Sequence, residues 1–129
     1  MRLKQHLELI HTILNARQEI TVESFYWQET VPGREGIIEV RLRFWDGSLL
    51  EFVEVLIEHG VVLVKTDYAY HYQDAQNQLI FRYDNAPHHP DIITHPHHKH
   101  TVQSIEPATP PHLGDVLQEI DQTLYPKNG

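Results

Sequence analysis

Both ends of the chain carry apolar residues at the spacing of an amphipathic helix. From Leu3 to Leu14 they recur every three or four positions, and charged and amide side chains lie mostly elsewhere around the axis. The segment 113–124 repeats this pattern with leucine, valine and isoleucine on one face, and Pro126 follows it. We therefore predict one helix over about residues 2–15 and another over about residues 113–124.

Between these helices the hydrophobic pattern changes to the period of two that half-buried strands show. The clearest case runs from Ile38 to Trp45, where apolar side chains alternate with glutamate and arginine. Similar segments begin near residues 19, 61 and 79. Turn residues separate them, and Asp46-Gly47 is a hairpin signal because glycine accepts a positive φ at little cost. These patterns predict an antiparallel sheet over about residues 19–84.

The segment LLEFVEVLIE, residues 49–58, fits two interpretations. Glu51, Glu54 and Glu58 could mark the solvent side of a helix that ends at Gly60. Its valine and isoleucine content and its flanking turns favour a strand instead. We predict a strand, and we expect the three glutamates to form a solvated face.

Residues 85–111 contain six of the eight prolines of the chain. Proline interrupts helices and is excluded from central strands, so this pattern predicts a long loop, and loops of this length are commonly functional. The resulting fold class is α+β. We expect a meander of about five antiparallel strands with the N-terminal and C-terminal helices packed on one face.

Length and composition limit the classes of protein to consider. A chain of 129 residues matches one domain. It has no cysteine, which removes disulfides, thiolate metal sites and a cysteine nucleophile, and favours a cytoplasmic location. No stretch approaches the roughly 20 apolar residues of a membrane span, so we expect a soluble intracellular protein without membrane contact. A formal net charge of −8 argues against nonspecific nucleic-acid binding and leaves only a local patch for anions.

Histidine supplies the most distinctive local feature. Six of the eleven histidines lie between His88 and His100, and a side-chain pKa of about 6.5 lets such a cluster gain positive charge near neutral pH. Proline restricts the preceding residue to extended conformations. In an extended chain His95 and His97 would point one way together with Lys99, and His98 and His100 would point the other way.

Acid–base catalysis on RNA is our leading hypothesis for this segment. RNA carries its own nucleophile, the 2′-hydroxyl, so two imidazoles and a cation satisfy the chemistry. The candidate catalytic residues are His88, His89, His97, His98 and His100. The candidate substrate-binding residues are Arg82 and Lys99 for phosphate and Tyr70 and Tyr72 for base stacking, with Asp84 and Asn85 as orienting residues.

Two alternatives stay open. A zinc or similar divalent metal could be held by imidazoles, with Asp84 or Asp91 nearby; the candidate ligands are His95, His97, His98 and His100. Lys99 beside these residues weakens that interpretation. The segment could also be a non-catalytic interaction surface whose histidines provide hydrogen bonds and stacking contacts. Tyrosines at period two, moreover, are more often core residues than platforms for bases.

The block from Tyr70 to His100 contains FRYDNAPHHP followed by PHHKH, and it resembles the signature of the TumE family of toxins from bacterial toxin–antitoxin systems. This resemblance implies a small toxin encoded beside a DNA-binding antitoxin that neutralises it by direct contact. It implies no particular catalytic residues. We therefore expect a toxin that cleaves RNA, with antitoxin and RNA as partners, and we also consider a homodimer.

Overall fold

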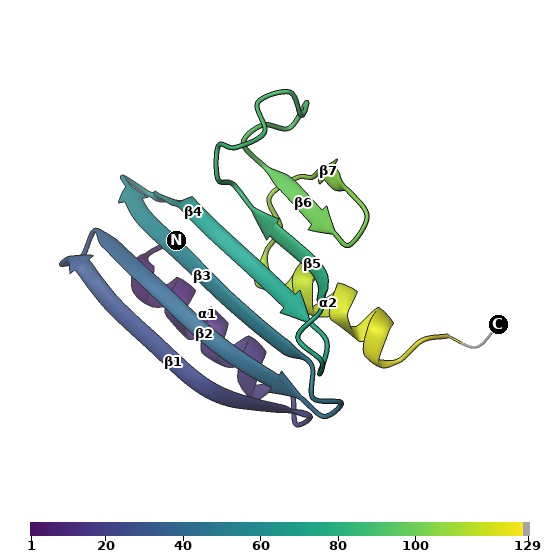
Figure 1. Cartoon of the computed structure of the whole chain (residues 1–129). Coiled ribbons are helices and arrows are strands. Elements are labelled where there is room, and N and C mark those ends of the chain that lie inside the picture. Colours follow the sequence, from purple (N-terminus) through teal and green to yellow (C-terminus); the bar gives the residue numbers. More distant parts are fainter. Residues whose placement is uncertain (128–129) are drawn as a thin grey trace.

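The computed structural model describes residues 1–127 and contains a seven-stranded antiparallel sheet with a helix at each end of the chain (Figure 1). The strands lie side by side in the order of the sequence, and each pairs with the next. The elements are α1 (Leu3–Asn15), β1 (Ile20–Val31), β2 (Glu35–Phe44), β3 (Leu49–His59), β4 (Val62–Gln73), β5 (Leu79–Asp84), β6 (His98–Thr101), β7 (Ile105–Pro107) and α2 (Leu113–Leu124). The α+β class and the meander are confirmed.

Both helices cover the same face of the sheet, as Figure 1 shows, because each has one apolar stripe to bury. Ile10 of α1 and Ile120 of α2 are 1% and 0% exposed. They belong to one core with the inward side chains of β2 to β5, including Leu42 and Phe52. The opposite face of the sheet carries no helix within the described residues, so its side chains are open to solvent or to a ligand. We call it the open face.

The prediction of about five strands was wrong, because the proline-rich segment also contains β6 and β7. Pro96 lies just before β6, and Pro107 is the last residue of β7. The missing proline N–H groups therefore fall where the sheet pairing begins or ends. The sequence of β6, HKHT, has no apolar alternation, so its pairing with β5 leaves no hydrophobic signal in the sequence.

Strand β3 was predicted correctly, but the expected solvated face was wrong for two of its three glutamates: Glu54, and Glu58, whose side chain is 9% exposed and lies 3.6 Å from Arg2. Glu54 is 1% exposed and lies on the helix-covered face, in line with Leu50 and Phe52. Glu51 lies on the open face, where its side chain is 49% exposed. Successive side chains of a strand alternate between faces, so glutamates three positions apart cannot share one.

The predicted hairpin at Asp46-Gly47 joins β2 to β3, and Gly47 has a φ of +84°. Glycine has no Cβ, so Gly47 can adopt the positive φ that this turn requires. Within residues 1–127, no helix is long and apolar enough to cross a membrane.

Candidate active site on the open face of the sheet

Strands β5 and β6 place four polar side chains on the open face. Asp84 pairs in register with His98, and Arg82 pairs with His100. Because residues two apart on a strand share a face, all four side chains project from the same side of the sheet. His89, from the loop between β5 and β6, reaches the same place. The sequence PHHKH thus contributes two histidines to the site through strand alternation.

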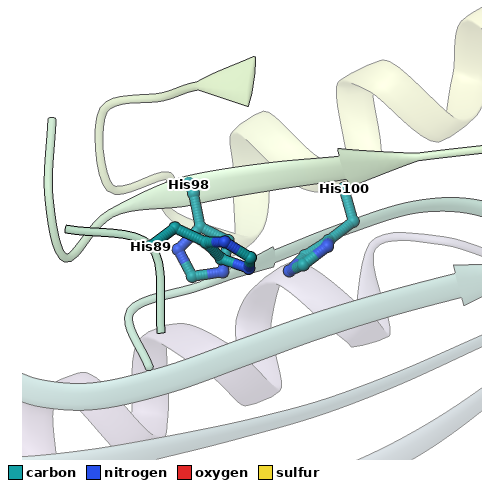
Figure 2. A group of neighbouring side chains, drawn as sticks. All are labelled: His89, His98 and His100. Atoms are coloured by element: carbon teal, nitrogen blue, oxygen red, sulfur yellow. The ribbon is translucent and has the colours of Figure 1, made fainter. Parts of the chain in front are cut away.

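The three imidazoles gather into one cluster, which Figure 2 shows on one side of the strand that carries His98 and His100. The ring centroids of His98 and His100 are 4.7 Å apart, and those of His89 lie 5.1 Å from His98 and 5.8 Å from His100. All three pairs are edge-to-face. We call these residues the histidine cluster.

Asp84 organises the cluster from beneath. Its carboxylate lies 2.8 Å from His98 Nε2, accepts a hydrogen bond of 2.9 Å from Arg82 Nε, and lies 3.6 Å from His100 Nε2. It also accepts a hydrogen bond from the backbone N–H of Ala86, which fixes the start of the loop. Asp84 is 6% exposed, so these partners satisfy a carboxylate that would otherwise be costly to bury.

His98 is held at both ring nitrogens. Nδ1 lies 2.8 Å from the carbonyl oxygen of Pro96, and Nε2 faces Asp84. Both partners are oxygen acceptors, so they hold the ring from its two sides. At 3% exposure this ring is buried. Pro96 and Asp84 therefore fix the position of the His98 ring beneath the accessible histidines.

His100 and His89 are the accessible members of the cluster, and both are only partly buried. Burial lowers the pKa of His100; Asp84 opposes that effect, and His98, His89 and Arg82 add to it. His100 is therefore mainly neutral near pH 7, which is the form that accepts a proton.

Arg82 provides the cation of the site. Its side chain is 39% exposed, and its Nη1 lies 3.3 Å from Nδ1 of His71 on the neighbouring strand β4. Asp84 accepts a hydrogen bond from Arg82 only at Nε, so the two terminal nitrogens of the guanidinium can also bind an anion. Sequence reasoning missed His71, whose place beside Arg82 follows only from the β4–β5 register.

The histidine cluster also has the residue types of a metal centre. One nitrogen from each of His89, His98 and His100 lies within 4.8 Å of the others. Zinc–imidazole bonds are only about 2.0–2.1 Å long, and His98 would have to give up Asp84 or Pro96 to free a nitrogen. A metal at this cluster would therefore require the rings to move from these positions.

The candidate ligands His95, His97, His98 and His100 are not brought together. His97 lies on the helix-covered side, where its Nδ1 is 2.9 Å from the hydroxyl of Tyr68. Burial lowers the pKa of His97, and His95 and His98 lower it further. His95 is exposed. As expected, His97 points to the opposite side of the sheet from His98 and His100, so it does not belong to the histidine cluster.

Three of the four candidate substrate-binding residues also lie away from the open face. Lys99 points toward α2 and donates a 2.7 Å hydrogen bond to Glu119. Tyr70 and Tyr72 are both 0% exposed within the core, so neither is available to stack on a base. The expectation for these tyrosines was wrong, because their apolar rings supply the inward face of β4.

The remaining candidates take peripheral positions. His88 and Asp91 are exposed in the loop. Asn85 accepts a hydrogen bond from the backbone N–H of Tyr68 and donates one to the carbonyl oxygen of Thr66. It therefore extends the β4–β5 pairing by side-chain contacts and anchors the beginning of the loop.

A second polar cluster, which sequence reasoning missed, lies under the helices. Glu54 is 2.7 Å from His6 Nε2, accepts a hydrogen bond from the Tyr70 hydroxyl, and is 3.6 Å from Lys65 Nζ. Burial raises the pKa of the Glu54 carboxyl, but His6, Lys65 and Tyr70 outweigh this effect and hold the pKa below its usual value. Lys65 also donates to Tyr70 and to the carbonyl oxygen of Pro111. These groups satisfy one another and connect α1 and the start of α2 to the sheet.

Comparison with known proteins gives one match. The model of the family described as Toxin TumE matches residues 9–124 of the 129. The matched region runs from within α1 to the last residue of α2 and includes every residue of the histidine cluster. No curated protein and no solved structure matches the chain significantly.

Proposed function

Because the chain belongs to the TumE family of toxins, we propose that it is a toxin that cleaves RNA by histidine acid–base catalysis at the histidine cluster. The observation that supports this proposal is the convergence of His89, His98 and His100 beside Asp84 and Arg82 on the open face. Two accessible imidazoles and an arginine are the groups that phosphodiester cleavage needs when the substrate supplies the nucleophile.

In the proposed reaction neutral His100 removes the proton of the RNA 2′-hydroxyl. The 2′-oxygen attacks the adjacent phosphorus and forms a 2′,3′-cyclic phosphate, and the bond from phosphorus to the 5′-oxygen breaks. His89 donates a proton to that leaving oxygen. Arg82 binds the phosphoryl oxygens, and His98 with Asp84 holds the two accessible rings in place.

The test is incubation of the purified protein with cellular RNA in the presence of EDTA. We expect the wild-type protein to cleave the RNA and His100→Ala to lose at least about 100-fold in rate, as removal of a general base does. His95→Ala is the matched control, because His95 belongs to the same segment but is exposed outside the cluster. Intact RNA with the wild-type protein, or equal loss in the two variants, would contradict the proposal.

Membership of a toxin family implies an antitoxin partner. We propose that this antitoxin is the DNA-binding protein that the sequence resemblance implies. A non-catalytic interaction role for the loop is the second candidate function, and Ile93, which is 92% exposed, is an apolar side chain that the loop offers to a partner. Ile93→Ser tests this role: loss of antitoxin affinity with unchanged RNA cleavage supports a docking contact, and unchanged affinity contradicts it. A homodimer stays a proposal, which sedimentation velocity tests.

A further inference from the structure

A hollow of about 550 Å³ lies on the open face next to the histidine cluster. Its size falls within the roughly 300–1,000 Å³ that small-ligand sites occupy. Val53 and Ala69, which pair in register on β3 and β4, are the short side chains on its floor. Longer side chains stand around them, among them Tyr26, which is 47% exposed on β1.

Two rows of register-paired residues connect this hollow to the cluster. One row runs through Val53 and Ala69 to Asp84 and His98. The other row runs from Glu51 through His71 and Arg82 to His100. The hollow and the cluster therefore belong to one continuous surface. Strands lie about 4.8 Å apart, so His100 and Glu51, three strands apart, are separated by about 14 Å.

The charges around the hollow indicate what part of a substrate it accepts. Arg41 and Arg82 are matched there by Glu39 and Glu51, and Arg41 is itself bonded to Glu51. A surface with balanced charge does not attract a run of phosphates. Its short apolar side chains, the nearby Tyr26 ring and the hydrogen-bonding groups around them resemble instead the features that hold an unpaired base.

We propose that this hollow binds a base of single-stranded RNA next to the scissile phosphate. The base lies flat over Val53 and Ala69, and Glu51, His71 and Gln73 offer hydrogen bonds to its edge. This inference rests on the proposed function, because it names the substrate of the same site as single-stranded rather than duplex RNA. Paired bases in a duplex cannot enter the hollow, since their edges and faces are already occupied.

The test fills the floor of the hollow with Ala69→Leu and uses Ala75→Leu as the matched control in the exposed β4–β5 turn. The probe is a labelled single-stranded oligonucleotide of mixed sequence with 2′-O-methyl groups, which the protein cannot cleave by the proposed reaction. Fluorescence anisotropy gives the affinity. Because Leu at position 69 would occupy the space of the base, we expect Ala69→Leu to weaken binding by at least about 5-fold, the lower end of what a stacked base contributes on an aromatic side chain, and Ala75→Leu to leave it unchanged.

Tyr26→Ser provides a second variant at an exposed position in case Ala69→Leu disturbs folding, and thermal unfolding checks both proteins. We expect Tyr26→Ser to weaken binding as well. Equal binding by the wild-type, Ala69→Leu and Tyr26→Ser proteins would overturn the inference, as would an absence of RNA binding by the wild type or equal affinity for duplex RNA. A cleavage assay with ordinary RNA separates this inference from the proposed function. If Ala69→Leu loses binding but the wild-type protein cleaves no RNA, the result supports the base-binding hollow and contradicts the proposed cleavage reaction.

Discussion

At the scale of single residues, the same side chain takes different roles according to the face and the depth at which it lies. The His98 ring is 3% exposed and lies between two acceptor oxygens, whereas the His100 ring, two residues later, is partly exposed and held mainly neutral. One ring is thus fixed in place, and the next can accept a proton. Asp84 is the residue on which both states depend, since it contacts His98 directly and His100 more distantly.

This division predicts a specific pH dependence. Since the pKa of His100 is lowered from 6.5, its neutral form persists to lower pH, and the acidic limb of kcat/KM for RNA cleavage should lie below pH 6.5. An NMR titration of the His100 ring should give a midpoint below 6.5. Arg82→Gln removes one positive charge and should raise that midpoint, whereas His95→Ala should leave the acidic limb in place. A His100 midpoint at or above 6.5 in the wild type would contradict this account.

The candidate site was predictable only in part from the sequence. Strand alternation alone separates His97 and Lys99 from His98 and His100, and the structure has that separation. The contribution of His89 depends instead on the path of the loop. The contribution of His71 depends on its register with Arg82, which lies eleven residues later in the sequence. Neither the loop path nor the register has a local signature.

At the scale of elements, β3 shows how one strand serves two layers. Its inward side chains pack under the helices and include Glu54, and its outward side chains include Glu51 on the open face. A glutamate among leucine and phenylalanine is tolerated because His6, Lys65 and Tyr70 surround it. The prediction that the glutamates form a solvated face was wrong for Glu54, because the residues that surround it come from α1 and β4, which are far away in the sequence.

Glu54 and Glu51 therefore make a matched pair for a stability measurement. Glu54→Gln leaves Lys65 buried without its opposite charge, so we expect the free energy of unfolding to fall by about 3–5 kcal/mol. Glu51→Gln removes one partner of a half-exposed ion pair with Arg41, so the free energy of unfolding should fall far less than in Glu54→Gln. Urea unfolding of both variants measures the difference. Similar losses would mean that the two residues do not occupy opposite faces as described.

The helices and the first five strands were predictable from apolar periods, strand-forming residues and flanking turns, and their observed bounds lie within a few residues of the expected ones. Strands β6 and β7 were not, because β6 is polar throughout, β7 has only three residues and ends in proline, and the pairing of each depends on the neighbouring strand. Tertiary contact, rather than local pattern, makes HKHT a strand. The element that carries two of the cluster histidines is thus the one with the weakest signal.

At the scale of the whole molecule, the fold separates stability from chemistry. One face of the sheet is covered by α1 and α2 and contains the core together with the Glu54 cluster. The other face carries the histidine cluster and the adjoining hollow. With a net charge of −8, the molecule has no general attraction for RNA, so recognition depends on local groups such as Arg82 and on unpaired bases.

The chemical ends of the cleaved RNA test the central claim most directly. A reaction in which His100 activates the 2′-hydroxyl must leave a 2′,3′-cyclic phosphate on one fragment and a 5′-hydroxyl on the other. Mass spectrometry of products formed in EDTA should show these ends, and a substrate with 2′-deoxy nucleotides at the cleavage sites should stay intact. Products with a 3′-hydroxyl and a 5′-phosphate, or cleavage of the deoxy substrate, would contradict acid–base catalysis by the histidine cluster.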